Sequence, residues 1–262
     1  MGVSRDLANI LRPLQGTFGV YGESLDSGEV AEVNADQVLP TQSAAKVFVL
    51  LHYAALVAAG ECDASARVVV PDDFRFNGTG VIRFLSAGLS LSREDLAWLM
   101  TIVSDNVATA LLLLEVGGPE AVNRAMADLG LATARLSSFE EMWAGAPFGT
   151  SSARDLARAY TYLDAASREK LFRQQDRIGL SRRLEHDPYA PDFELVMPVR
   201  AYTKSGIGPT DFIDSGLFET DAGRWVIAAM ASELPPRTGR AGDAVPAAFG
   251  EIGWTLFTRW GC

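Results

Sequence analysis

Residues 40–46 read Pro40-Thr41-Gln42-Ser43-Ala44-Ala45-Lys46. A mostly apolar segment follows and continues to Gly60, which predicts a buried helix whose first turn holds Ser43 and Lys46. Their spacing of three places both side chains on one helix face. A lysine amine can activate a serine hydroxyl when burial and nearby positive charge lower the pKa of that amine. The amide groups of a first helical turn also point toward a developing oxyanion, so the stretch predicts a nucleophilic serine.

Lysine is rare in this chain, where it occurs only as Lys46, Lys170 and Lys204. The other basic residues are arginines, whose guanidinium group does not give up its proton. Ser167 and Lys170 repeat the serine–lysine spacing in an ordinary polar helix, so the spacing alone is a weak signal. The occurrence of Lys46 and Lys204 within candidate motifs favours a role for an amine that can be deprotonated.

Composition restricts the classes of partner. The 262 residues are 48% hydrophobic and 21% charged, which suits one or two globular domains with a substantial core. The net charge of -10 and the pI of 4.7 disfavour a phosphate backbone, so we expect no nucleic-acid partner.

The N-terminal residues show no signal peptide, because Leu7–Leu14 is interrupted by polar residues and a proline. No uninterrupted apolar stretch reaches the ~20 residues of a membrane span, so we expect no membrane association. If Met1 is the natural start, we expect a cytoplasmic protein, and we expect it to be a monomer.

Predicted strands occur at both ends of the chain. They are Thr17–Leu25, Glu29–Asn34, Val199–Lys204, Phe212–Thr220 and Trp225–Ala231. Helical patterns occupy Ser4–Leu14, Val245–Trp260 and most of the middle, whereas Gly130–Gly149 lacks periodicity and is predicted to be a long loop. We expect an α/β (α+β) fold with an antiparallel sheet flanked by the terminal helices. Residues 1–40 plus 198–262 would form the sheet domain, residues 41–197 an inserted all-helical domain, and a pocket would lie between them.

Two polar triplets adjoin predicted elements. Residues 104–106 (Ser-Asp-Asn) precede an apolar helix, and residues 204–206 (Lys-Ser-Gly) end a predicted strand. Each has an ordinary structural explanation, the first as a helix N-cap and the second as a strand running into a turn. The functional interpretation makes Ser104 a proton-relaying hydroxyl, Asn106 a substrate-binding amide and Lys204 a fixed positive charge.

Taken together and in this order, the three motifs resemble those of the class A β-lactamases and penicillin-binding proteins. Segments 95–100, 103–109 and 115–119 are also similar to that family, and the resemblance covers nearly the whole chain. It implies a β-lactamase-like fold, a small-molecule substrate and no cofactor.

The resemblance also implies catalytic roles. Ser43 attacks a carbonyl carbon, and Lys46 takes its proton directly or through Glu140 and a water. Ser104 passes the proton to the leaving group, and Lys204 tunes Ser104.

It implies substrate-binding roles as well, at Asn106, Ser205, Gly206 and Ile207. The strand edge would bind the substrate backbone, and the N–H groups of Ile207 and Ser43 would form an oxyanion hole.

Residues 135–140 (Arg-Leu-Ser-Ser-Phe-Glu) resemble the family's run that ends in the water-activating glutamate, so Glu140 is the match. Glu141 is the alternative, and a solvated loop carboxylate is the plain structural explanation. The family has an asparagine four residues later, where this chain has Ala144, and the loop is shortened.

A second departure concerns the substrate. Thr210–Asp214 holds two aspartates and no cation where many family members place an arginine, and Arg224 is the nearest cation in sequence. Our first hypothesis is a serine hydrolase of the class A β-lactamase type, acting through acyl-Ser43 on a β-lactam or a related amide or ester. The alternative is a cytoplasmic biosynthetic amidase, esterase or transacylase on the same scaffold. A non-catalytic binding module is disfavoured because every motif residue is present.

Other chemistries lack their residues. The chain has two histidines, His52 and His186, and no Gly-x-Ser-x-Gly elbow, which disfavours a Ser-His-Asp hydrolase. It has no His-Glu-x-x-His motif and no phosphate-binding glycine loop. Cys62 and Cys262 are too few for a metal cluster; a disulfide stays open, but two separate thiols are favoured.

Overall fold

A five-stranded antiparallel sheet joins the two ends of the chain in the computed structural model, which describes residues 2–72, 74, 78–86, 88–174, 179–184, 199–235 and 244–262. The strand order is β2-β1-β10-β9-β8. The strands are β1 (Thr17–Ser24), β2 (Val30–Val33), β8 (Arg200–Ile207), β9 (Phe212–Glu219) and β10 (Arg224–Ser232). The predicted antiparallel sheet is confirmed. Of the two histidines, His186 lies outside the described residues.

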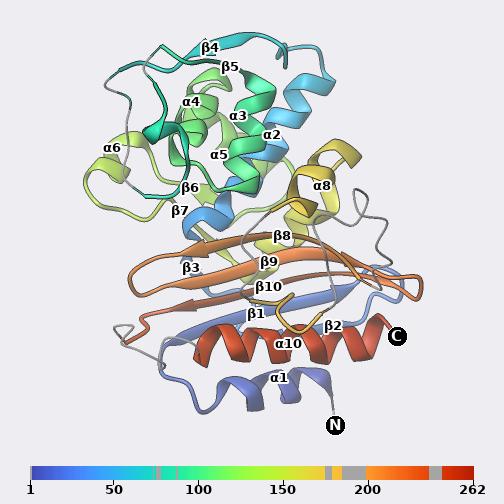
Figure 1. Ribbon diagram of the computed structural model, residues 1–262. Helices are drawn as coiled ribbons and strands as arrows, with labels where there is room; N and C mark the ends of the chain where they lie inside the picture. The colour runs from blue at the N-terminus through green and yellow to red at the C-terminus, as the bar shows by residue number, and fades with distance from the viewer. Residues whose placement is uncertain are drawn as a thin grey trace.

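The terminal helices α1 (Val3–Leu11) and α10 (Ala244–Trp260) cover one face of this sheet and lie side by side (Figure 1). Their inward residues meet alternate residues of the strands in one apolar core, which includes Leu7, Phe249 and Ile252. Burial of this face explains why a helix from each end of the chain packs on the same sheet.

The other helices stack above the opposite face (Figure 1). They are α2 (Lys46–Ala58), α3 (Arg93–Ile102), α4 (Asn106–Glu115), α5 (Gly118–Asp128), α6 (Phe139–Trp143), α7 (Ala153–Ala159) and α8 (Ala165–Phe172). Helix α2 runs through their centre, and its first six residues, 46–51, are all buried. A helix that is apolar on every side is expected only in such a central position.

Short strands and turns complete this part. They are β3 (Val38–Pro40), β4 (Arg67–Val69), β5 (Ser90–Ser92), β6 (Arg135–Leu136), β7 (Gly149–Ser152) and the 3-10 turns η1 (Gln42–Ala45), η2 (Ile82–Phe84) and η3 (Tyr160–Tyr162). Because β3 pairs with β7, residues 38–40 are tied to the helical part. The proposed division at residues 40 and 198 stays a prediction.

The prediction of a continuous loop over Gly130–Gly149 is wrong, because β6 and α6 lie within it. Ser138 accepts a hydrogen bond from the Glu141 N–H, and the Glu141 carboxylate accepts one from the Ser138 N–H, which forms a capping box. The side chain of Asn123 bonds both backbone groups of Leu136 and holds β6 in place. A five-residue helix is too short to produce a periodic pattern.

Three smaller expectations concern the cysteines, His52 and the membrane. Cys62 and Cys262 are free thiols, the first buried and the second exposed. His52 Nε2 donates a hydrogen bond to the Val116 carbonyl oxygen, 3.0 Å away, as a packed residue does. Within the described residues, none of the helices combines the length and hydropathy that crossing a bilayer requires. The monomeric state stays a prediction.

Candidate active site

Ser43 lies in η1, directly before α2 and against strand β8. A Cβ on Gly206 would collide with the Thr41 carbonyl oxygen and would lie 2.8 Å from the Ala44 amide nitrogen. Only glycine therefore lets β8 approach the turn that carries the serine. Gln42, just before Ser43, has a φ of 47°, which is uncommon for a residue other than glycine.

The side chains of Lys46, Ser104 and Lys204 converge on one oxygen atom. Ser104 Oγ lies 3.0 Å from Lys46 Nζ and 3.1 Å from Lys204 Nζ. All three residues are buried, with Lys46 3% and Lys204 1% exposed. Residues separated by 58 and 100 positions thus form one hydrogen-bonded cluster.

Burial is the main reason why the pKa of Lys46 is lowered well below its ordinary value, and the positive charge of Lys204 adds to the effect. Asp105 opposes it by favouring the charged amine. A lowered pKa favours the neutral amine, which is the form that a general base needs.

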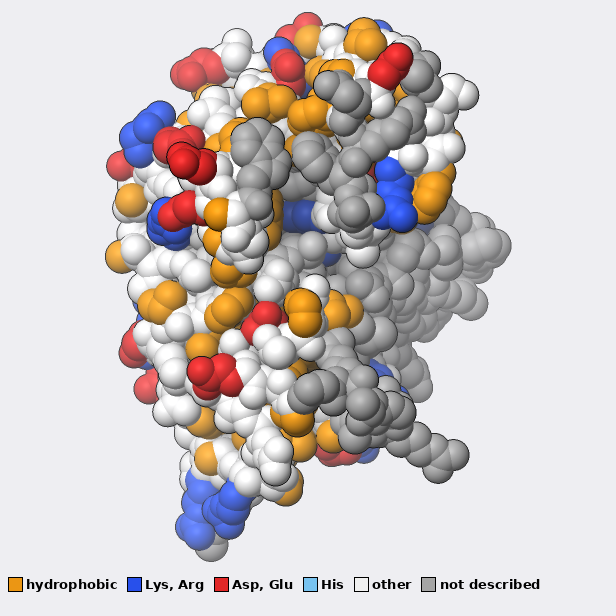
Figure 2. Space-filling view, turned by 90° about the vertical axis from the view of Figure 1, so that its left-hand side faces the viewer, with side chains coloured by type: hydrophobic (Ala, Val, Ile, Leu, Met, Phe, Trp, Pro, Cys, Tyr) orange, Lys and Arg blue, Asp and Glu red, His pale blue; other side chains and the backbone are white. Residues whose placement is uncertain are grey.

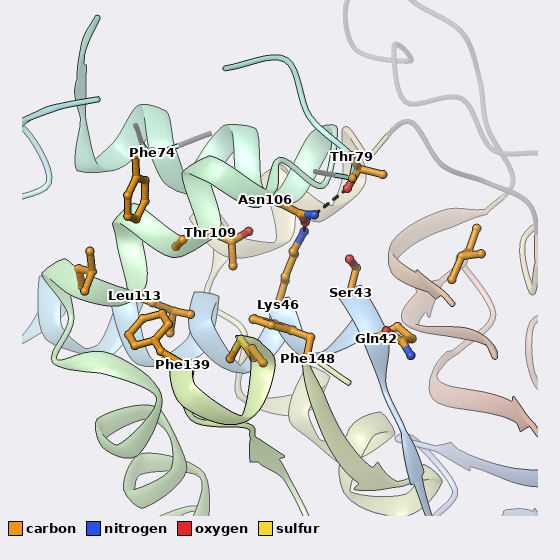
Figure 3. Close-up of a pocket in the computed structure, with 15 residues that line it drawn as sticks. Gln42, Ser43, Lys46, Phe74, Thr79, Asn106, Thr109, Leu113, Phe139 and Phe148 are labelled. Carbon is orange, nitrogen blue, oxygen red and sulfur yellow. Dashed lines mark hydrogen bonds between the residues drawn. The ribbon is translucent and has the colours of Figure 1, made fainter. Parts of the chain in front are cut away.

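The other partners of Lys46 fix where its nitrogen lies. It donates to the Ser104 carbonyl oxygen at 2.7 Å and to Asn106 Oδ1 at 2.9 Å. Thr79 Oγ1 also donates to the Ser104 carbonyl, at 2.6 Å. Figure 3 shows the Ser43 hydroxyl and the Lys46 amine on the same side of the η1–α2 backbone, both directed toward Asn106 and Thr79.

Ser104 is not the cap of α4, because Asp105 takes that position. Asp105 accepts hydrogen bonds from the N–H groups of Val81 at 2.6 Å, Ile82 at 2.9 Å and Ala108 at 3.0 Å. Ser104 itself has a φ of 54°, so its conformation depends on these neighbouring contacts. The buried carboxylate therefore joins the 78–82 loop to the start of α4 beside the cluster.

Replacing Asp105 with alanine is expected to lower the free energy of unfolding by more than about 3 kcal/mol, because three backbone donors lose their acceptor. Urea unfolding of the purified variant measures the loss. Asp164→Ala is the matched control, since that exposed N-cap accepts one bond, from the Ser167 N–H, and should cost about 1 kcal/mol. Equal losses in the two variants would contradict this role of Asp105.

A cavity of about 490 Å³ opens beside Ser43, a size typical of small-molecule sites. Ser43, Lys46, Asn106 and Ile207 line it, so the structure brings these four predicted residues to one cavity. Figure 2 shows a hollow on this face of the molecule, with a blue Lys or Arg side chain at depth and orange hydrophobic side chains on its rim.

The predicted strand edge adjoins the same place. Ser205 and Gly206 are buried, and Ile207 is exposed and lines the cavity. Arg224 does not supply a cation here. It lies at the start of β10 and pairs with Asp26 at 3.1 Å, whereas Ser232 ends the same strand eight residues away. Whether Ile207 and Ser43 form an oxyanion hole stays a prediction.

Glu140 is exposed and is not among the described residues that line the cavity. Its neighbours Phe139 and Met142 line it instead. Glu141 accepts from Arg135 at 2.8 Å and from the Ser138 N–H, and these bonds lower the pKa of its carboxyl. Neither carboxylate is among the described residues that line the cavity or among the hydrogen-bond partners of Lys46 given above, and a catalytic role for either one stays a prediction.

Sequence reasoning missed Thr79, Phe139 and the pair of Gln42 with Asp211. Gln42 Nε2 donates to Asp211 Oδ2 at 2.8 Å, and Ser232 Oγ donates to Asp211 Oδ1 at 2.7 Å, which ties η1 to the turn after β8. Two of these residues had a sequence signal: Gln42 adjoins Ser43, and Phe139 adjoins Glu140.

Comparison with known proteins extends over the whole chain. The family described as the beta-lactamase enzyme family matches residues 2–260. A beta-lactamase of Streptomyces albus G is 32% identical in an alignment of 168 residues that covers 60% of this chain and 52% of that relative, so the chain spans only about half of its length. The crystal structure of a beta-lactamase from Sphaerobacter thermophilus DSM 20745 has a TM-score of 0.83 at 26% identity, covering 98% of this chain and 96% of that chain. An ancestral class A beta-lactamase, GNCA, shares the fold with a TM-score of 0.82 at 20% identity, covering 99% and 100%.

Proposed function

Because the chain belongs to the beta-lactamase enzyme family, we propose that it is a serine hydrolase that forms an acyl-enzyme at Ser43 from a β-lactam or a related amide or ester. The observation that carries the proposal is the convergence of Lys46 and Lys204 on Ser104 Oγ beside a cavity that Ser43 lines. The class A resemblance noted in the sequence is confirmed by the family match and by the fold.

Acylation follows from this geometry. Neutral Lys46 takes the proton of Ser43 as Ser43 Oγ bonds to the carbonyl carbon, and the bond from that carbon to the leaving nitrogen or oxygen breaks. Ser104 donates its own proton to the leaving group and regains one from the protonated Lys46. Its Oγ lies within hydrogen-bond distance of both amines, so Lys204 orients Ser104 and stabilises negative charge that develops on it.

Deacylation requires a water activated beside acyl-Ser43, after which the acid leaves and the proton returns to Ser43. Glu140 is the family's match for that base, yet it is exposed outside the lining of the cavity. We therefore expect acylation to be faster than deacylation. This observation favours the second candidate function, an amidase, esterase or transacylase with weak β-lactamase activity.

Intact-protein mass spectrometry tests the proposal. After incubation with benzylpenicillin, the protein should gain the full mass of the opened β-lactam, and peptide mapping should place it on Ser43. Ser167→Ala serves as a matched control that keeps the adduct, because Ser167 has the same spacing to a lysine but is not among the described residues that line the cavity. An unchanged mass with penicillins, cephalosporins and simple activated esters alike would overturn the proposed function.

A further inference from the structure

We infer that the cavity beside Ser43 is a subsite for an unbranched apolar acyl chain, so that the substrate is an ester or amide of a medium-chain acid. This inference rests on the acyl-Ser43 function proposed above. It adds the class of acyl group that the site selects.

The cavity has a polar end and an apolar end. Gln42, Thr79 and Asn106 lie on the same side of the cavity as the nucleophile, Ser43 (Figure 3). Of the fifteen described residues that line the cavity, eight are hydrophobic, and Figure 3 shows Phe74, Leu113 and Phe139 across Lys46 from the serine. Such a division matches a reactive carbonyl joined to an apolar tail.

One wall of the cavity comes from α4. Thr109, Ala110, Leu113 and Leu114 follow Asn106 at helical spacing, so one face of this helix runs from the polar end to the apolar end. The apolar positions of α4 therefore continue beyond the Asn106 amide, in the direction that the acyl chain of the substrate would follow.

The facing wall comes from α6 and from the residue just before β7. Phe139 and Met142 are three residues apart and share a face of α6, and Phe148 lies just before β7. The capping box and the pair with Arg135 hold the Glu141 side chain in a different direction from Phe139 and Met142. The segment that carries the carboxylates thus presents hydrophobic side chains to the cavity.

The position of the proton donor decides which half of the substrate enters the cavity. Ser104 and Lys204, to which we assign the leaving group, are not among the described lining residues. The acyl group stays bonded to Ser43, so we place it in the cavity that Ser43 lines. Lys46 is the one ionisable residue among the described lining residues, and a charged substrate group at the apolar end would be desolvated without a partner.

A series of unbranched 4-nitrophenyl esters from acetate to octanoate tests the inference. Ser43 Oγ bonds to the acyl carbon, the ester C–O bond breaks and 4-nitrophenolate leaves as an anion, while the serine proton goes to Lys46. Water then releases the carboxylic acid. We expect kcat/KM for acylation to rise about fourfold with each added methylene while the chain stays within the cavity.

Leu114→Asp places a carboxylate at the mouth of the apolar end, at a side chain that is already 53% exposed and therefore tolerates the change. The ratio of kcat/KM for octanoate over acetate should fall about tenfold or more. Val69→Asp is the matched control, because Val69 is 59% exposed and is not among the described lining residues, and it should keep the wild-type ratio.

The outcomes separate the two proposals. Acylation at rates independent of chain length, or an equal fall in the ratio for both aspartate variants, would overturn the apolar subsite while leaving the acyl-enzyme function in place. Absence of acylation by every ester and β-lactam would overturn both.

Discussion

Lys46→Met is expected to slow acylation of Ser43 by about 10²–10⁴-fold at neutral pH, because it removes the base from the hydroxyl. Methionine keeps an unbranched chain of similar length in the buried position. Thr79 still donates to the Ser104 carbonyl in this variant, so that acceptor keeps a hydrogen bond. Quenched-flow mass spectrometry with a penicillin and with an activated ester measures the rate constant.

Lys170→Met is the matched control for this prediction. Lys170 is also buried and bonds Glu94 at 2.7 Å, but it is not among the described residues that line the cavity. The control should lose stability while acylating at the wild-type rate. Acylation of Lys46→Met within tenfold of wild type would show that another group activates Ser43.

Lys204→Met is expected to move the acidic limb of the acylation–pH profile to higher pH. The charge of Lys204 lowers the pKa of Lys46, so its removal raises that pKa. Acylation needs neutral Lys46 and rises as the pH passes through this pKa; a raised pKa therefore requires a higher pH for the same rate. Rate constants measured across the pH range in wild type and variant give the shift directly.

The same variant distinguishes two kinds of substrate. A β-lactam or amide needs a proton on its leaving nitrogen, and Lys204 orients the Ser104 hydroxyl that gives it. Nitrophenolate leaves without a proton. We therefore expect a loss of about 10²–10³-fold for a β-lactam beyond any loss for the nitrophenyl ester.

Lys204→Arg keeps the positive charge and should return the acidic limb toward its wild-type position. An acidic limb that stays unchanged in Lys204→Met would contradict the electrostatic role. Equal losses for the β-lactam and the ester would contradict the role in protonating the leaving group.

Local patterns predicted the parts of the fold that have a strong sequence signal. The C-terminal strands of the sheet are runs rich in strand-forming residues, both terminal helices have helical spacing, and the structure has these elements. The three polar motifs pointed to Lys46, Ser104 and Lys204, whose polar atoms the structure places at hydrogen-bond distance. Each motif lies beside a helix or strand that the sequence pattern predicts clearly.

The remainder depends on contacts between distant residues. The direction in which α6 faces is set by its capping box and by the Arg135–Glu141 pair, so the sequence match at Glu140 does not reveal that Phe139 lines the cavity. Thr79 lies in a loop without periodicity and reaches the Ser104 carbonyl from 25 residues away. The left-handed conformation of Ser104 likewise follows from tertiary contacts.

The central claim is that Lys46 is the base for Ser43, because burial and the charge of Lys204 lower the pKa of its amine. Carbon-13 NMR of protein labelled at the lysine Cε tests it most directly, because the chain holds three lysines and arginine replacements assign each signal. The account predicts that the Lys46 signal titrates well below the ordinary lysine value of about 10.4, and at higher pH in Lys204→Met. A Lys46 signal that titrates at or above that ordinary value, with no change in Lys204→Met, would contradict it.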